Sequence, residues 1–412
     1  MHDVFIIGAG MIRFGKYPDE TVRTMAEQAI HLALKDAGLE KRDLQAAFFS
    51  NTFWGMFANQ HSIRGQVVLR RMGIDKIPVT NVENACAGGS TALHLAYTGV
   101  RAGMFDVALA IGSEKITSPN KLESLQAYAS CMDMENFQPH VQMILEVGKS
   151  FAIDLPEDES APGQGRSIFM DAYAMGARWH MDRFGSTQRQ LAVISAKNHV
   201  HGSLNPLAQY QKPMTVEEVL ADPPIAYPLT RAMCSPVGDG AAAAIVCSER
   251  FLKKLNGSRP VKILASVLGQ GSERDLDGVD IGERLSKEAY EFAGLGPNEI
   301  DLAELHDATA YGELHQTEVM GFCPAGGGGP FAESGATQLG GTKPINTSGG
   351  LECRGHPIGA SGLAQIFEIV TQLRGEAGKR QVEEARTALA ENGGGNIGFE
   401  EAAMCVHVLQ KA

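Results

Sequence analysis

Short apolar runs that end in glycine or in polar residues alternate along the chain with longer amphipathic segments. The runs at residues 4–8, 46–50 and 107–111 are typical of buried strands. Residues 21–37 carry apolar side chains at helical spacing, and Gly38 follows them as a common helix stop. This alternation of strands and helices predicts an α/β fold built in layers.

The C-terminal part of the chain repeats the order of the N-terminal part. An apolar run at 261–266 leads to a glycine, as the run at 4–8 does. A helical pattern over 283–293 comes next, followed by a strand-like run at 302–306. We therefore expect two related α/β halves within one chain.

A polar stretch that matches neither half separates them. Residues 117–225 are rich in Met, Gln and Pro and predict an insertion, a lid or loop domain, within the first half. The predicted N-terminal half then comprises residues 1–116 and 226–256. The predicted C-terminal half comprises residues 257–412.

Charge and cysteine usage narrow the function classes. The 36 basic and 48 acidic residues give a net charge of −12, which disfavours nucleic-acid binding. No apolar run approaches the ~18–20 residues that span a bilayer, and the N-terminus is strand-like. Seven scattered cysteines without a CxxC pair argue against a disulfide framework and a zinc ribbon. We expect a reduced, cytoplasmic protein that binds neither membrane nor metal.

The segment NACAGGS at residues 84–90 carries the first candidate chemistry. Cys86 precedes a small-residue helix, whose positive end favours a thiolate. Gly88 and Gly89 would let a substrate approach the backbone closely. The alternative is a buried structural cysteine, which is common for a free thiol.

Three further segments carry residues suited to acyl chemistry. His356, in the turn GGLECRGHPIGASG, is placed to act as a general base if the two halves bring it to Cys86. His306 ends a predicted strand and could stabilise an oxyanion. The glycine-rich segment 392–398 could offer backbone N–H groups to a second oxyanion. The alternative for His356 is a turn histidine with local hydrogen bonds, and the alternative for 392–398 is a flexible turn.

These motifs together resemble the thiolase superfamily. NACAGGS, LHDATA, GGLECRGHPIGASG and the final glycine-rich turn stand in that family's order. Residues 197–210 and 228–242, and the His306-Asp307 pair, resemble the sterol-carrier-protein-type thiolase and acetyl-CoA acetyltransferase branch. The resemblance covers essentially the whole chain. It implies a thiolase fold, with two similar α/β halves in a five-layered αβαβα arrangement and an inserted loop domain.

The resemblance also implies a reaction. Cys86 would attack a 3-oxoacyl-CoA and His356 would take its proton, while His356 and His306 would hold the departing enolate. Coenzyme A, a substrate, would then accept the acyl group, with the oxyanion on the N–H of Cys86 and a backbone N–H near Ile397 and Gly398. The direction would be degradative. The family suggests branched, steroid-side-chain or aromatic acyl groups, benzoylsuccinyl-CoA among them, as much as linear ones.

The sequence departs from the family at the second catalytic cysteine. No sulfur stands near Gly395, where ordinary thiolases carry it, and Ala308 replaces the cysteine that often follows the His-Asp pair. Cys353, three residues before His356, is the first candidate replacement, and Cys323 is the second. The alternative is that Cys353 is passive, as free cysteines often are.

Three other functions stay open at this point. A thiolase-like retro-aldol lyase would need no acyl-cysteine, and an acyltransferase would pass the acyl group to a non-CoA acceptor. A non-catalytic subunit would only bind a partner. The resemblance implies a homodimeric core and a small zinc-ribbon/OB-fold partner protein.

Overall fold

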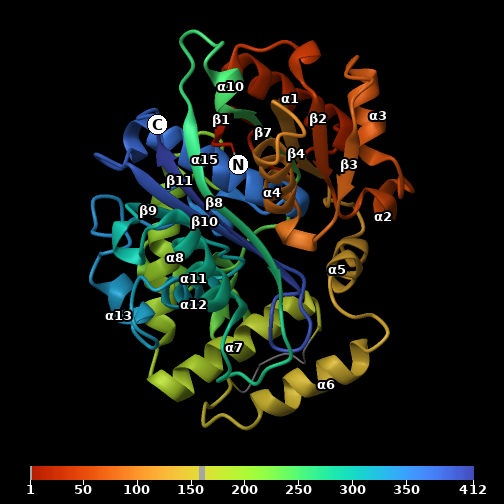
Figure 1. The fold of residues 1–412 in the computed structure, drawn as a ribbon. Helices are drawn as coiled ribbons and strands as arrows, with labels where there is room; N and C mark the ends of the chain where they lie inside the picture. Colours follow the sequence, from red (N-terminus) through yellow and green to blue (C-terminus); the bar gives the residue numbers. More distant parts are fainter. Residues whose placement is uncertain (1, 157–162) are drawn as a thin grey trace.

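A nine-stranded sheet runs through the centre of the molecule (Figure 1). The computed structural model describes residues 2–156 and 163–412. The strand order is β3–β2–β4–β7–β1–β8–β11–β10–β9. The strands are β1 (Val4–Met11), β2 (Ala46–Ser50), β3 (Val79–Val82), β4 (Val107–Glu114), β7 (Gly240–Ser248), β8 (Val261–Gln270), β9 (Leu302–Glu304), β10 (Thr387–Gly394) and β11 (Ala403–Lys411).

The sheet consists of two matching halves that meet at β1 and β8. These two strands pair antiparallel, with Val4 opposite Ile263. Outward from β1, β7 and β4 pair antiparallel and β4 and β2 pair parallel. Outward from β8, β11 and β10 pair antiparallel and β10 and β9 pair parallel. A parallel bridge between Ala303 and Ile345 stands where β3 lies in the first half.

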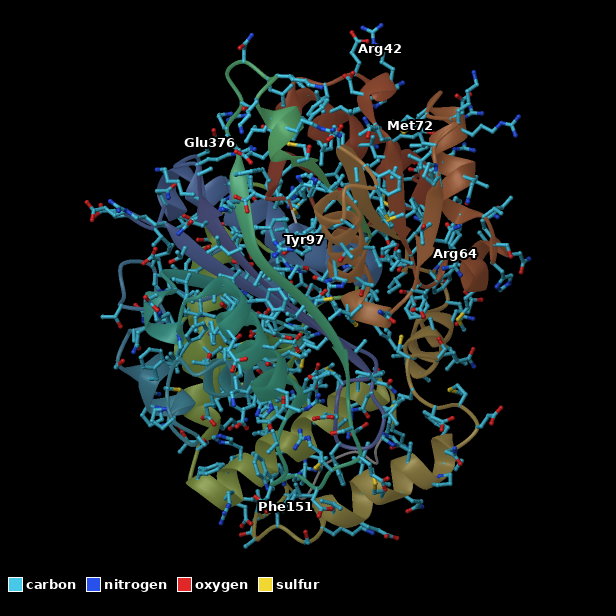
Figure 2. The ribbon with its side chains drawn as sticks, in the orientation of Figure 1. Arg42, Arg64, Met72, Tyr97, Phe151 and Glu376 are labelled. Carbon is cyan, nitrogen blue, oxygen red and sulfur yellow. The ribbon has the colours of Figure 1, made fainter. Side chains whose placement is uncertain are left out.

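The two halves of the sheet are stacked, with helices between them and on both outer sides, which gives five layers. Helix α1 (Val22–Ala37) packs on the outer face of the first half and α11 (Ile281–Ala293) on that of the second. Helices α4 (Gly88–Arg101) and α15 (Ser361–Leu373) pack against each other between the halves. Tyr97 of α4, labelled in Figure 2, belongs to this central core.

Alternating side chains along each strand hold these layers together. Ile6 of β1 packs in the central core, whereas its neighbours Phe5 and Ile7 pack under α1. Successive strand residues point to opposite faces, so a strand buried on both sides is a continuous apolar run. This is why the apolar runs predicted the strands.

Local signals set the ends of the outer helices. The hydroxyl of Thr21 caps α1 by accepting the N–H of Thr24, and Gly38 ends it with φ 65°. The strand expected at 4–8 continues to Met11, and the helix expected at 283–293 begins at Ile281. The glycine-rich turn expected at 392–398 begins later, because residues 392–394 pair with β11.

The chain between β4 and β7 contributes no strand to the large sheet in the part that the structure describes. Its helices α6 and α7 lie at the bottom of the view and α5 lies at its right side (Figure 1). Helix α8 is buried against α12 (Ala310–Val319) and α14 (Gly350–Arg354). The elements here are α5 (Lys121–Ala129), α6 (Phe137–Gly148), α7 (Ile168–Phe184), α8 (Gln188–Ser203), α9 (Val216–Leu220), β5 (Pro224–Ala226) and β6 (Leu229–Thr230).

Shorter helices complete the two halves. Among the described residues, no helix has both the length and the apolar character needed to cross a bilayer. The remaining helices are α2 (Trp54–Ala58), α3 (Arg64–Arg71), α10 (Glu249–Leu252), α12 (Ala310–Val319), α13 (Gly328–Glu333) and α14 (Gly350–Arg354).

Candidate active site

Cys86 lies in a short 3₁₀ helix, η2 (Ala85–Ala87), between β3 and α4. Gly394, the last residue of β10, packs against this turn. A Cβ atom at Gly394 would lie 2.4 Å from the backbone nitrogen of Ala87 and 2.9 Å from that of Cys86. Glycine at this position therefore lets a strand end of the second half approach the cysteine of the first.

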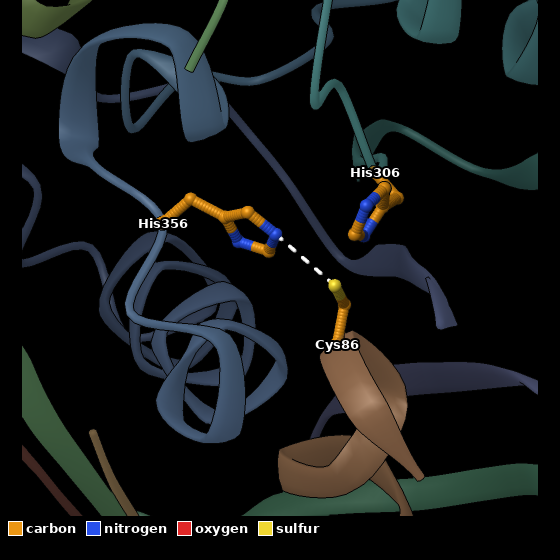
Figure 3. A group of neighbouring side chains, drawn as sticks. All are labelled: Cys86, His306 and His356. Atoms are coloured by element: carbon orange, nitrogen blue, oxygen red, sulfur yellow. Dashed lines mark hydrogen bonds between the residues drawn. The ribbon is translucent and has the colours of Figure 1, made fainter. Parts of the chain in front are cut away.

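His356 reaches Cys86 from the second half. It lies in the turn between α14 and α15, after Gly355, whose φ of 106° favours glycine. Its Nε2 atom lies 3.3 Å from Sγ of Cys86 (Figure 3). The thiol and the imidazole are thus within hydrogen-bond reach, as a nucleophile and its base must be.

Ser361 determines which nitrogen of His356 faces the thiol. The Ser361 hydroxyl lies 2.7 Å from Nδ1 of His356 and donates to the carbonyl oxygen of Pro357 at 3.1 Å. Because the hydroxyl has one proton to give, it accepts from Nδ1–H. Nε2 is then unprotonated and can accept the proton of the Cys86 thiol.

His306 faces the same space from the end of β9. Its Nδ1 atom accepts from the side-chain amide of Asn392 at 2.9 Å, which leaves the proton on Nε2. Its ring and that of His356 meet edge to face, with centroids 5.2 Å apart. One nitrogen of each ring and the sulfur of Cys86 all lie within 4.8 Å of one another (Figure 3).

Two buried carboxyl groups hold the turn that carries His356. Oδ1 of Asp307 accepts the backbone N–H of Leu351 at 2.6 Å, and a Cβ at Gly350 would lie 1.9 Å from Oδ2 of Asp307. Glu304 pairs with Arg354 at 2.9 Å. Since Asp307 follows His306 directly, one short segment both supplies a histidine and positions the other.

A cavity of about 390 Å³ opens onto the three side chains. Lys16, Arg166 and Arg231 line it together with the site. Most of its apolar lining comes from the segment between β4 and β7. These residues are Leu125, Tyr128, Cys131, Phe169, Met170, Tyr173, Tyr210 and Ile225.

A smaller chamber of about 100 Å³ adjoins this cavity. Trp179 and Tyr311 line it beside the buried charges of Arg274 and Asp280. The two spaces have part of their lining in common, and His306 belongs to it. The shared residues are Phe169, Tyr173, His306, Gly395 and Glu401.

Two family models together match most of the chain. Residues 4–218 match the family described as "Thiolase, N-terminal domain", and residues 270–410 match "Thiolase C-terminal domain-like". The chain belongs to the thiolase family. It is an acyltransferase of that family, and the predicted resemblance is confirmed.

Three curated thiolase relatives are similar over nearly the full chain. The acetyl-CoA acetyltransferase of Methanothermobacter thermautotrophicus is 37% identical, over 97% of this chain and 98% of its own. Sterol carrier protein 2 of Bos taurus is 36% identical, over 97% and 73%. Benzoylsuccinyl-CoA thiolase subunit BbsB of Thauera aromatica is 34% identical, over 95% and 94%.

Solved structures confirm the thiolase fold. A chain of the "Ltp2-ChsH2(DUF35) aldolase" superposes with a TM-score of 0.77 at 22% identity, covering 100% of this chain and 98% of the other. Human mitochondrial 3-ketoacyl-CoA thiolase gives a TM-score of 0.65 at 18% identity, covering 100% and 99%. At these identities the likeness concerns the fold alone.

The resting thiolase site is electrically neutral. Burial raises the pKa of Cys86 to about 12, although the backbone of Gly395 lowers it in part. Burial, the neighbouring His306 and Arg354 hold the pKa of His356 well below its ordinary value, and burial lowers that of His306 to about 4. Burial therefore acts against the thiolate that the helix end was expected to favour. The 3.3 Å contact would allow the proton of Cys86 to pass to Nε2 of His356.

The structure does not bring Cys353 to the reaction centre. Its side chain is buried in α14 and faces α8, where its Sγ would lie 3.7 Å from a Cβ on Gly202. It does not line the Cys86 cavity, and burial raises the pKa of its thiol well above the ordinary value. Cys323 lies in a separate surface hollow beside Glu318 and Pro324.

The structure also does not bring Ile397 to Cys86. The N–H of Ile397 donates to the carbonyl of Glu400 at 3.0 Å, and its side chain is 54% exposed. Gly398 lines only the smaller chamber. Instead, the backbone of Gly395 acts on the thiol and lowers the pKa of Cys86. The donor lies earlier than expected because β10 runs to Gly394 and delivers the next residue to the thiol.

Sequence reasoning missed the side chains that line the cavity from other segments. Tyr128, Cys131 and Tyr173 lie in a polar stretch whose pattern gives no sign of facing Cys86. Glu401 follows the glycine-rich segment 392–398 and lies outside its motif. Tertiary packing brings each of these side chains close to Cys86, and no local sequence motif marks any of them.

Proposed function

We propose that this thiolase cleaves a 3-oxoacyl-CoA with CoA through an acyl-Cys86 intermediate, in the degradative direction. The observation that carries the proposal is the 3.3 Å contact between Sγ of Cys86 and Nε2 of His356. The thiol proton passes to Nε2 while sulfur attacks the keto carbon. The bond between C2 and C3 then breaks, which leaves the acyl group on Cys86 and an enolate of the shortened thioester.

Neutral imidazoles suit the enolate that departs. The Nε2–H of His306 points into the site because Asn392 occupies Nδ1, and His356 carries a proton after the first step. Two such donors stabilise a developing oxyanion. For the acyl-cysteine, we assign the oxyanion donors to the backbone N–H groups of Cys86 and Gly395, which both lower the pKa of the thiol.

The lining of the two spaces supports a bulky acyl group. Phe169, Tyr173 and Trp179 provide aromatic surface next to His306. We propose branched, steroid-side-chain or aromatic acyl groups, consistent with a relative named benzoylsuccinyl-CoA thiolase subunit. Lys16 and Arg231 at the larger cavity favour the phosphates of CoA.

The assembly proposed is a homodimeric core with a small zinc-ribbon/OB-fold partner, in the cytoplasm. The word "subunit" in the name of BbsB supports a partner. All seven cysteines are free thiols, as a reducing compartment would keep them. Co-purification from the native source tests this: a homo-oligomer fully active alone would contradict the partner.

A retro-aldol lyase is the second candidate, favoured by the absence of a thiol at Ala308 and Gly395. Its substrates would be 3-hydroxyacyl-CoA esters cleaved without CoA. A transfer to a non-CoA acceptor, or a purely structural subunit, would show no CoA-dependent cleavage of any thioester.

One assay separates these functions. The purified protein is given linear, branched and aromatic 3-oxoacyl-CoA and 3-hydroxyacyl-CoA esters, with and without free CoA. We expect cleavage of 3-oxoacyl esters only, consuming one CoA and yielding two thioesters. Cleavage of 3-hydroxyacyl esters without CoA would overturn the proposal. Cys247→Ala, a buried cysteine of β7 outside the site, is the control for Cys86→Ala.

A further inference from the structure

The reaction proposed above needs a second proton carrier. The enolate must be protonated at C2, and the incoming CoA thiol must lose its proton before it attacks acyl-Cys86. His356 cannot serve both steps, because it already holds the Cys86 proton. The positions where the family motifs would carry a second thiol have none: residue 308 is alanine and residue 395 is glycine, while Cys353 faces α8.

Glu401 lies where such a carrier is needed. It lines both the Cys86 cavity and the adjoining chamber, as His306 does. Its side chain lies over Gly393 of β10, where a Cβ would be 2.8 Å from Cγ and 3.4 Å from Oε1 of Glu401. The glycine thus leaves room for the carboxyl group at the end of β10, next to the residue that packs against the Cys86 turn.

The carboxyl group of Glu401 is free to exchange a proton. Within residues 2–156 and 163–412 it has no hydrogen-bond or ion-pair partner beyond its own backbone. The adjacent Glu400, by contrast, is fully used: it pairs with Arg274 at 3.0 Å and accepts the N–H of Ser272. Two successive glutamates therefore have different roles, one structural and one unengaged.

The surroundings favour a mixture of both protonation states near neutral pH. Burial first, and then Asp280, raise the pKa of Glu401 to about 7, while His315 and Arg274 act in the opposite direction. Glu391, on the same face of β10, has a raised pKa through burial and in part through Glu401. A carboxyl group balanced in this way can both give and take a proton at working pH.

We propose that Glu401 is the second acid/base of this thiolase, an assignment that rests on the proposed acyl-Cys86 reaction. The protonated carboxyl gives its proton to C2 of the enolate as the bond between C2 and C3 breaks. The resulting carboxylate takes the thiol proton of the incoming CoA. The CoA sulfur then attacks acyl-Cys86, and the departing Cys86 sulfur recovers its proton from His356. Every proton is thereby returned to its origin, apart from the one that moves from CoA to C2.

Cys131 is the alternative candidate for the second acid/base in the same cavity. It lines the space beside Cys86, but burial first and then Cys86 itself hold its pKa well above the ordinary value. A thiol in that state is a poor base at neutral pH. Its role is decided by the same experiment.

The test compares Glu401→Gln, Cys131→Ser and wild type in two measurements. The first is exchange of the C2 protons of acetyl-CoA with D₂O, followed by mass spectrometry. The second is the rate at which iodoacetamide alkylates Cys86, read by peptide mapping, which reports the Cys86–His356 pair alone. For Glu401→Gln we expect exchange to fall by about 10²-fold or more, with alkylation within about twofold of wild type. Cys247→Ala, a buried cysteine of β7 that lines neither cavity, is the control and is expected to keep both rates. Cys131→Ser, at the cavity wall, is expected to lower exchange less than Glu401→Gln does.

Other outcomes overturn the assignment. Exchange at the wild-type rate in Glu401→Gln, or its loss in Cys131→Ser alone, would remove Glu401 from the reaction. Glu401→Asp, which keeps the carboxyl group, is expected to retain part of the exchange, and equal losses in the Asp and Gln variants would indicate a packing role. If wild type forms no acyl-Cys86 from any thioester, the proposed function fails first, and this result is separate from the others.

Discussion

The hydroxyl group of Ser361 lies 2.7 Å from Nδ1 of His356 and fixes the tautomer that faces Cys86. Ser361 donates its own proton to Pro357, so it can only accept from the ring. Ser361, which lines neither of the two cavities, therefore determines which nitrogen of His356 faces Cys86.

Ser361→Ala tests this tautomer directly. Loss of the acceptor should let Nε2 carry the proton in part of the molecules and slow acylation of Cys86 by about 10- to 100-fold. Pre-steady-state acylation with a 3-oxoacyl-CoA measures it. Ser90→Ala is the matched control, since the buried Ser90 hydroxyl has no partner among the residues described. Equal rates in the two variants would contradict the role of Ser361.

Asp307→Ala should damage both stability and reaction rate. The substitution leaves the Leu351 N–H unpaired, which costs about 1–3 kcal/mol of unfolding free energy, and releases the turn that holds His356. Denaturant unfolding and Cys86 alkylation report the two effects. Asp301→Ala removes comparable backbone hydrogen bonds from Arg386 and Thr387 away from the site. It should lower stability and leave alkylation intact; an unaltered alkylation rate in Asp307→Ala would refute the positioning role.

Cys353→Ala should leave turnover within about twofold of wild type, because the thiol faces α8 and not the cavity. Steady-state thiolysis measures this. A loss comparable with that of Cys86→Ala would mean that the turn rearranges to bring Cys353 into the reaction.

The two proposed proton carriers, His356 and Glu401, should give different pH dependences. His306, with a pKa of about 4, and His356, whose pKa is well below its ordinary value, are neutral at pH 6.5, so Cys86 alkylation should show no step there. The exchange of acetyl-CoA protons needs the carboxylate of Glu401 and should rise as pH increases through about 7. The Glu401→Gln variant should lack that rise. Facing groups that contribute to the profile are Asp280, His315, Arg274 and Glu391. A step at pH 6.5 in alkylation would contradict the neutral histidines.

Zinc should inhibit this thiolase. Donor atoms of Cys86, His306 and His356 lie within 4.8 Å of one another, a set that suits Zn²⁺ once the thiol is deprotonated. Added Zn²⁺ is expected to block turnover reversibly, whereas a chelator alone should leave turnover unchanged. Activity lost on chelation and restored by a metal ion would instead establish a metal requirement.

The sequence predicts most of the fold and part of the site, for a physical reason. Cys86, His306 and His356 each stand in a short motif that also builds their turn, and the repeat places the turns at one interface. Cys353 shares the motif of His356, but α14 directs its side chain the other way. The backbone donor is found at Gly395, since strand β10 is longer than the glycines suggest. Burial raises the pKa of Cys86, and it results from tertiary packing and not from a local motif. Catalytic roles and the domain limits at 117–225 and 257–412 stay predictions.

The central claim is that Cys86 carries the acyl group, and intact-protein mass spectrometry after brief incubation with a 3-oxoacyl-CoA, without CoA, tests it most directly. We predict one added acyl mass, mapped to the peptide that contains Cys86, removed by CoA and missing in Cys86→Ala but present in Cys247→Ala. Full CoA-dependent turnover by Cys86→Ala, or an adduct on another residue of an active enzyme, would contradict the account.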